Sequence, residues 1–283
     1  MSEFNAWIGR EMRVADRLDE ALARRWLATF DLGPAEDGTL PQGIHFALCT
    51  PEAPSAQLGE DGHPARDQSA TSFLPPLPLP RRMWASSAIE FLAPVAVGSA
   101  IERTSRVASI SEKEGASGKL AFVNVEHDTR SNGTLSVREV QTLVYREAAA
   151  PDAPLSPPEV GDEGFDTAPW DRFHVERPDE ALLFRYSALT FNTHRIHYDA
   201  PYAREVERYR GLVVHGPLTA SLMLQFAARE LGHNRLRRFE FRGMSPAIVG
   251  EALILVFRGV DEGFEMAAVA ADGRQVTKAR ARV

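Results

Sequence analysis

The chain has 283 residues, of which 44% are hydrophobic and 25% charged, a balance typical of a globular protein with room for two domains or one large one. Its net charge of -7 argues against a protein that binds nucleic acid, because such proteins carry an excess of Lys and Arg. Cys49 is the only cysteine, which excludes an intrachain disulfide and a metal site built from several cysteines.

The beginning of the chain has no basic segment followed by an apolar one, and no apolar run is long enough to span a membrane. The single cysteine also fits a reducing compartment. We therefore expect a cytoplasmic protein with no membrane partner and no nucleic-acid partner.

Residues 51–80 are rich in proline, which predicts a loop in place of a helix or strand. Four large apolar residues in its second half are unusual for a solvated linker: Phe73, Leu74, Leu77 and Leu79. We predict that this loop lies over another surface of the protein, in the manner of a lid.

A second stretch, residues 147–161, carries four prolines among small residues and divides the chain nearly in half. We predict that it links an N-terminal domain, residues 1–146, to a C-terminal domain, residues 162–283.

The two halves share a pattern. Residues 89–101 align with residues 241–253, with Pro94 over Pro246 and Gly98 over Gly250. After each segment, two alternating apolar runs are joined by a turn that contains Asn-Gly or Asp-Gly, which predicts an antiparallel hairpin. One structural unit is thus expected to occur twice, although a chance likeness between two strand-rich sequences stays open.

A polar cluster follows an apolar run in the C-terminal half. Residues 182–191 read as a strand, and they are followed by Asn192, His194, His197 and Asp199. We expect the strand to deliver these side chains to one loop.

Residues 216–231 predict a helix that is apolar nearly all round, with Pro217 in its first turn and Gly232 just after its end. A helix without a polar face must be wrapped by other elements. Together with the hairpins, this predicts an α+β fold, a double hotdog in which two antiparallel sheets are each wrapped around a central helix.

The sequence Leu-Thr-Phe-Asn-Thr-His-Arg-Ile-His-Tyr-Asp, which ends at Asp199, resembles the signature of MaoC-like (hydratase 2) enzymes. Ile196, His197 and Asp199 keep their places in that signature. The whole stretch is similar to a subgroup that contains itaconyl-CoA and mesaconyl-CoA hydratases and type 2 hydroxyacyl-thioester dehydratases. The likeness covers the C-terminal half, whereas the N-terminal half is similar only as a degenerate partner domain.

The resemblance implies addition of water to the double bond of a CoA thioester, which needs a base for water and donors for the thioester oxygen. We predict that His197 is the base, since an imidazole takes up and returns a proton near neutral pH. His215-Gly216 matches the start of the hotdog helix in the family. The N–H of Gly216 is the predicted oxyanion donor, because a helix N-terminus favours negative charge.

Asn192 departs from the family's pattern, in which an Asp occupies this place and belongs to the catalytic pair. An amide does not exchange protons at neutral pH. Either Asn192 positions water and His197 performs both proton steps, or another acid approaches from elsewhere, and we favour the first. Asp199 is the nearest acid in sequence, but we expect it to orient the loop or cap the next helix.

His194 and His215 are predicted beside the substrate, with structural roles in the loop and at the helix start as the alternative. With His197 and Asp199 they also have the residue types of a metal site. The signature contains this spacing without a metal, so we expect none. The other five histidines are expected at the surface or in satisfied polar positions: His45, His63, His127, His174 and His233.

Coenzyme A carries phosphates, and a dicarboxylic acyl group adds a carboxylate, both of which pair well with arginine. We predict five arginines that bind substrate: Arg81, Arg82, Arg185, Arg195 and Arg242. The first two are assigned to phosphates. We rank Arg242 highest, because the repeat has Glu90 at its place and the fold therefore does not require an arginine.

The sequence thus predicts a hydratase that converts itaconyl-CoA or mesaconyl-CoA reversibly to citramalyl-CoA. A 3-hydroxyacyl-thioester dehydratase of fatty acid metabolism and a non-catalytic acyl-thioester-binding protein stay open as alternatives. No glycine-rich loop lies between a strand and a helix, so we expect no nucleotide cofactor. A homodimer is compatible with this fold, since dimers are the commonest soluble assembly.

Overall fold

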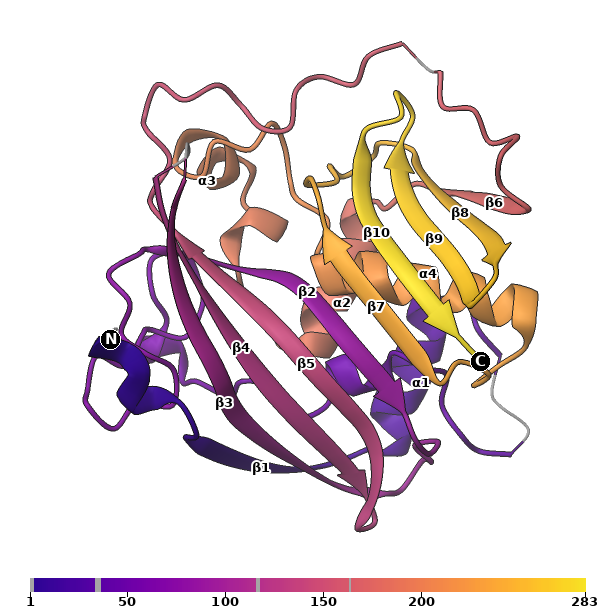
Figure 1. Ribbon diagram of the computed structural model, residues 1–283, viewed down its shortest axis with the longest axis horizontal. Helices are drawn as coiled ribbons and strands as arrows, with labels where there is room; N and C mark the ends of the chain where they lie inside the picture. Colours follow the sequence, from indigo (N-terminus) through magenta and orange to yellow (C-terminus); the bar gives the residue numbers. More distant parts are fainter. Residues whose placement is uncertain (1–2, 34–36, 116–117, 163) are drawn as a thin grey trace.

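The computed structural model describes the chain except for residues 1–2, 34–36, 116–117 and 163. Within the described residues, the strands form one antiparallel sheet in the order β1-β3-β4-β5-β2-β7-β10-β9-β8-β6. The sheet curves, and α1, α2 and α4 lie behind it in the view of Figure 1. The site described below lies between the sheet and these elements.

The strands are β1 (Glu11–Arg17), β2 (Arg81–Phe91), β3 (Ala100–Gly115), β4 (Gly118–Ser131), β5 (Thr134–Arg146), β6 (Arg172–Glu176), β7 (Arg238–Gly243), β8 (Leu253–Val260), β9 (Gly263–Ala270) and β10 (Gln275–Arg282). The α-helices are α1 (Glu20–Thr29), α2 (Glu180–Thr190), α3 (Ala200–Glu205) and α4 (Gly216–Leu231). Short 3-10 helices are η1 (Glu3–Trp7), η2 (Ile44–Ala47), η3 (Ser55–Gln57) and η4 (Arg195–His197). No helix among the described residues is both long and apolar enough to cross a membrane.

The two halves repeat the same order of elements, which confirms the predicted repeat. Each half begins with a strand and a helix, and ends with three strands joined as hairpins. The matched glycines, Gly98 and Gly250, both have a positive φ, +87° and +79°, which glycine adopts without strain. The helices match as well, because Asp19 and Asp179 each accept a hydrogen bond from the N–H three residues later.

The predicted strand at residues 182–191 is wrong, because this segment is helix α2. Asp179 caps its N-terminus, and Leu183, Tyr186 and Leu189 are its buried positions, spaced three residues apart as on one helix face. The helix ends where Phe191 adopts a left-handed conformation with a φ of 48°.

The double hotdog has two features that differ from the predicted pair of wrapped helices. The half-sheets are not separate, because β2 pairs with β7 from Ser86 opposite Arg242 to Glu90 opposite Arg238. In the C-terminal half α4 is the central helix, and every residue from 218 to 227 is buried. In the N-terminal half the corresponding place in the chain, between the first helix and β2, holds the short η2 and a long loop.

The proline-rich loop packs against the N-terminal half-sheet, as predicted from its apolar residues. Leu77 and Leu79 are buried in a cluster with Val107, Val123 and Tyr145, and Phe73 and Leu74 are partly buried beside it. The guanidinium of Arg66 donates to the carbonyl of Leu79 and so ties the loop to itself. The loop is therefore a packed element of the fold.

Candidate active site

A cavity of about 900 Å³ lies between the two halves, and residues of both halves line it. Its volume is in the range of sites that hold small molecules and cofactors. From the C-terminal half, the lining includes the predicted site residues Asn192, His194, His197, His215 and Gly216. The fold thus brings these five residues to one space, although they lie on separate elements.

His197 lies on η4, and its ring orientation is fixed by one hydrogen bond. Its Nδ1 is 2.7 Å from the backbone oxygen of Val213, so Nδ1 carries the hydrogen and Nε2 keeps a lone pair. The side chain is buried, and burial lowers the pKa of His197 to about 3, with a further contribution from His194. His197 is therefore a neutral imidazole near pH 7, as a proton acceptor must be.

His215 stacks on His197, with ring centroids 3.6 Å apart and planes inclined by 20°. Its Nε2 is 2.9 Å from the hydroxyl of Ser187, and burial holds its pKa well below the ordinary value. His215 is the N-cap residue of α4, so Gly216 is the first residue of the helix. The N–H of Gly216 has no hydrogen-bond partner within the described chain, and the space beside its Cα is open to 4 Å. A free donor thus lies at the positive end of a buried helix.

Asn192 follows the end of α2, and its backbone N–H donates to the carbonyl of Ser187. Its side-chain Oδ1 accepts a hydrogen bond of 2.9 Å from the backbone N–H of His194. Asn192 therefore shapes the turn before η4, and its amide NH₂ is the part that can orient a water or a substrate oxygen.

A pair of residues from the N-terminal half, Asp61 and His63, extends this row of imidazoles. Asp61 Oδ2 is 3.0 Å from Nδ1 of His63, and the His63 ring lies 4.0 Å from that of His194. His194 in turn lies 5.5 Å from His197, edge to face. His63 is a satisfied polar residue, as one of the two predicted alternatives, and it also lines the cavity within this row, which was not predicted.

The loop that carries Asp61 and His63 is clasped to residues 193–195. Thr193 Oγ1 donates to the carbonyl of Gly62, and the backbone N–H of Arg195 donates to that of Asp61. Arg195 also donates from its side chain to the carbonyl of Glu60. The predicted lid loop is thus held on residues 193–195 of the signature. Because Gly62 has no side chain, the loop can lie close to the backbone of Thr193.

Asp199 orients this loop, as predicted, and does not join a metal site with the histidines. Its carboxylate pairs with Arg195 at 2.7 Å and caps the N-terminus of α3. Each of the stacked rings of His197 and His215 has one nitrogen engaged by the protein, Nδ1 of His197 by Val213 and Nε2 of His215 by Ser187.

The predicted arginines are dispersed. Arg82 lines the cavity, whereas Arg81 is buried in an ion pair with Glu207. Arg195 is engaged by Asp199 as described, Arg185 is exposed and donates to the carbonyl of Ala28, and Arg242 is exposed on β7. Arg81, Arg185, Arg195 and Arg242 are not among the residues that line the cavity. A contact of these four with an acyl group in the cavity therefore has no support in the geometry.

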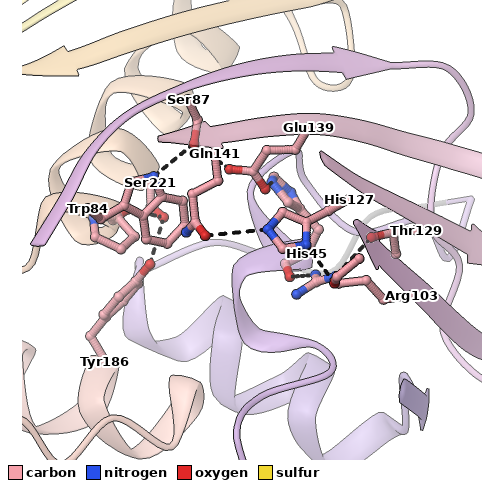
Figure 2. Close-up of polar contacts among 12 residues, drawn as sticks. His45, Trp84, Ser87, Arg103, His127, Thr129, Glu139, Gln141, Tyr186 and Ser221 are labelled. Atoms are coloured by element: carbon pink, nitrogen blue, oxygen red, sulfur yellow. Dashed lines mark hydrogen bonds and ion pairs between the residues drawn. The ribbon is translucent and has the colours of Figure 1, made fainter. Parts of the chain in front are cut away.

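A second polar cluster lies on the N-terminal side of the cavity, and sequence reasoning missed it (Figure 2). Its members line the cavity from η2, β3, β4 and β5, and they are His45, Arg103, His127, Glu139 and Gln141. Arg103 donates to Thr129 Oγ1 at 3.1 Å and to the carbonyl of His45 at 2.6 Å. No sequence spacing links these residues, because pairing of β3, β4 and β5 brings four of them together and the packing of η2 adds His45.

Charge in this second cluster is concentrated on Arg103. Burial raises the pKa of Glu139 and so favours its neutral form, while its Oε1 accepts a hydrogen bond of 2.5 Å from the hydroxyl of Ser87. Burial, together with the charge of Arg103, lowers the pKa of His127 to about 3 and that of His45 well below its ordinary value. Arg103 has no ion pair with a carboxylate of the described residues, so its guanidinium is the cation that faces this part of the cavity.

Replacement of Gly62 tests the clasp. A Cβ at residue 62 would lie 2.0 Å from the carbonyl oxygen of Thr193, and φ is +84°. Gly62→Ala should lower the free energy of unfolding by more than the ~1–3 kcal/mol that a positive φ alone costs, as measured by urea denaturation. Gly98→Ala is the matched control, because Gly98 has a φ of +87° and open space at its Cβ. Equal losses in the two variants would contradict the clasp.

The buried histidines predict how stability depends on pH. His127, His194 and His197 have a pKa of about 3 in the fold, against 6.5 in an unfolded chain. Between these values the unfolded chain binds more protons, so the free energy of unfolding should fall as pH is lowered from 6.5 toward 3. Urea denaturation at a series of pH values measures the slope. His127→Gln should make the slope shallower, because it removes one of the buried imidazoles, and an unchanged slope in this variant would contradict the account of His127.

The sequence and the structure of the chain are both similar to those of known proteins. The chain is 39% identical to the mesaconyl-C(4)-CoA hydratase of Chloroflexus aurantiacus over 96% of its own length and 95% of that protein. A MaoC-like dehydratase from Phytophthora capsici superposes with a TM-score of 0.74 over 100% of this chain and 98% of the other, at 13% identity.

The fold is confirmed by a Mycobacterium tuberculosis protein described as a double hotdog, which superposes with a TM-score of 0.59 at 15% identity and covers 97% of this chain and 95% of its own. The model of the family called hydroxyacyl-thioester dehydratase type 2 matches residues 43–249, a span that contains both polar clusters of the cavity. The chain therefore belongs to the hydroxyacyl-thioester dehydratase type 2 family.

Proposed function

We propose that the protein is a hydratase that adds water reversibly to a short dicarboxylic enoyl-CoA, with mesaconyl-CoA or itaconyl-CoA giving citramalyl-CoA. This proposal rests on two groups that lie in one cavity. His197 is a neutral imidazole whose Nδ1 donates to Val213, and its ring stacks on His215. The next residue, Gly216, has an N–H without a partner among the described residues. The name of the Chloroflexus relative supports the same reaction.

The chemistry requires a base, an electrophilic donor and little competing water. Nε2 of His197 takes a proton from water, and the water oxygen bonds to the β-carbon of the enoyl group. The electrons of the double bond move toward the thioester oxygen, where the N–H of Gly216 stabilises the developing negative charge. His197 is buried, and the N–H of Gly216 lies at the N-terminus of a helix whose residues 218–227 are buried, so water screens the interaction less than in bulk solvent.

Asn192 remains the residue that positions water in this proposal. Its Oδ1 is occupied by the N–H of His194, so its NH₂ can donate to the attacking oxygen but cannot remove a proton. This agrees with the interpretation that favours His197 as the base.

The dicarboxylic substrate class is supported by the N-terminal side of the cavity. A hydrocarbon tail placed there would desolvate Arg103, His127 and Gln141 without offering them a hydrogen bond, which costs free energy. A carboxylate would instead accept a charge-assisted hydrogen bond from Arg103. We thus propose that Arg103, and not Arg242, binds the carboxylate of the acyl group.

The fatty-acid alternative is a 3-hydroxyacyl-thioester dehydratase, as the family name describes, with the same His197 and Gly216 acting in the dehydration direction. It requires an apolar acyl site. The polar N-terminal side of the cavity favours the dicarboxylic class over it.

Product analysis by mass spectrometry tests the reaction. Purified protein should add one water to mesaconyl-C4-CoA, and His197→Gln should lower kcat by about 10²–10⁴-fold, the usual contribution of general acid–base catalysis. Crotonyl-CoA is included as the test of the fatty-acyl alternative. Hydration of crotonyl-CoA alone would move the assignment to that alternative, and no hydration of any substrate would favour a binding protein.

Substrate discrimination tests Arg103. In 3-methylcrotonyl-CoA a methyl group replaces the carboxylate of mesaconyl-C4-CoA. Arg103→Gln should lower kcat/KM for the carboxylated substrate by about 10–100-fold, the effect of a lost charged hydrogen bond, and leave the neutral substrate nearly unchanged. Arg242→Gln, outside the cavity, is the matched control and should change neither. An equal loss on both substrates in Arg103→Gln would remove Arg103 from recognition.

A further inference from the structure

Addition of water across a double bond involves two proton transfers, and the C-terminal signature supplies one clear group for them. The water loses a proton as its oxygen bonds to the β-carbon, and the α-carbon gains one. His197 accepts the first. Asn192 cannot provide the second, because an amide holds its protons at neutral pH.

His63, paired with Asp61, lines the same cavity from the N-terminal half. The side chains of His63 and Asp61 are 23% and 32% exposed, so the pair lies at the edge of the buried row and can exchange protons with solvent. Asp61 accepts from Nδ1 of His63 at 3.0 Å, which fixes the ring and leaves Nε2 as the exchanging nitrogen. Nothing in the mechanism above uses these two groups.

Charged and titratable groups face His63 from both halves of the chain. Asp61 is in contact, and the hydrogen bond and charge of His63 outweigh burial to lower the pKa of Asp61 to about 2, so this carboxylate stays negative. His194 faces His63 from the next segment, and burial lowers its pKa to about 3, with His63 adding to the effect. The other titratable groups nearby are His197, Arg66, Arg82 and Tyr202.

The fold fixes the pair with respect to His194 and His197. In the clasp, the backbone carbonyls of residues 60–62 accept from the side chains of Thr193 and Arg195 and from the backbone N–H of Arg195, which holds the residues just before His63 in place. The backbone N–H of His63 also donates to Asp61 Oδ1, which adds a second link within the pair.

Resting on the proposed hydratase function, we propose that His63, oriented by Asp61, is a second proton-transfer residue that protonates the α-carbon of the enoyl thioester. An O–H bond of water breaks, its proton passes to Nε2 of His197, and the oxygen bonds to the β-carbon. The electrons of the double bond move to the α-carbon and thioester oxygen, and the α-carbon takes the proton from Nε2 of the His63 imidazolium. His197 then holds one proton more and His63 one fewer, and the ring of His194, in contact with both, lies on the path that restores them.

Chemical rescue tests this role. His63→Ala should lower kcat for hydration by about 10²–10⁴-fold with KM nearly unchanged, and added imidazole should restore part of kcat, more so at a pH where imidazole is protonated. Asp61→Asn keeps a hydrogen-bond partner for His63 and removes the charge, so it should lower kcat and shift the pH profile of kcat to lower pH. His174→Ala is the control, because His174 pairs with Glu176 on the far strand β6.

Three results would overturn the proposal while wild-type hydration stands. The first is a His63→Ala variant with wild-type kcat. The second is a folded, inactive His63→Ala variant, shown by its melting temperature, that imidazole does not rescue. The third is a wild-type enzyme inactivated by a chelator and restored by a divalent metal, which would make Asp61, His63 and His194 a metal site. Wild-type protein without hydratase activity would instead overturn the proposed function.

Discussion

The antiparallel pairing of β2 with β7 is the constraint on which the rest of the structure depends. It joins two half-sheets into one and sets one half beside the other, with Ile89 opposite Phe239, both fully buried. Because the sheet is continuous, the concave space behind it is shared by both halves. The cavity is therefore lined from β3, β4 and β5 on one side and from η4 and the start of α4 on the other.

The two halves contribute different groups to the cavity, because among the described residues only the C-terminal half has a long central helix. Helix α4 fills the C-terminal half-sheet with apolar side chains and presents Gly216 at its N-terminus. In the N-terminal half η2 is a single turn, and the space that a longer helix would occupy is available to the cavity and the loop of residues 51–80. In the proposed mechanism, His197 and Gly216 come from the C-terminal half and Arg103 from the N-terminal half. The loop of residues 51–80 adds His63 as the proposed second proton-transfer residue.

Much of this arrangement was predictable from sequence, for physical reasons that also explain the errors. The repeat and the buried helix follow from local patterns, such as hairpin turns and a helix that is apolar nearly all round, whereas His197 and Gly216 were singled out by the resemblance to the hydratase signature. Helix α2 was predicted as a strand because Phe184, 73% exposed, and Phe191, 57% exposed, make its apolar run look continuous and hide the helical period. Arg103, His63 and the rest of the N-terminal lining are brought to the cavity by strand pairing and by the clasp on Thr193, which no spacing in the chain reveals.

We propose that one cavity, built by both halves, holds the thioester beside His197 and the acyl end beside Arg103. A crystal structure of the protein with citramalyl-CoA, the hydrated product, tests it most directly. The account predicts the thioester oxygen at about 3 Å from the N–H of Gly216, the hydroxyl group near Nε2 of His197, and the carboxylate directed toward Arg103. A thioester bound outside the cavity, or an acyl group directed away from both His197 and Arg103, would contradict it.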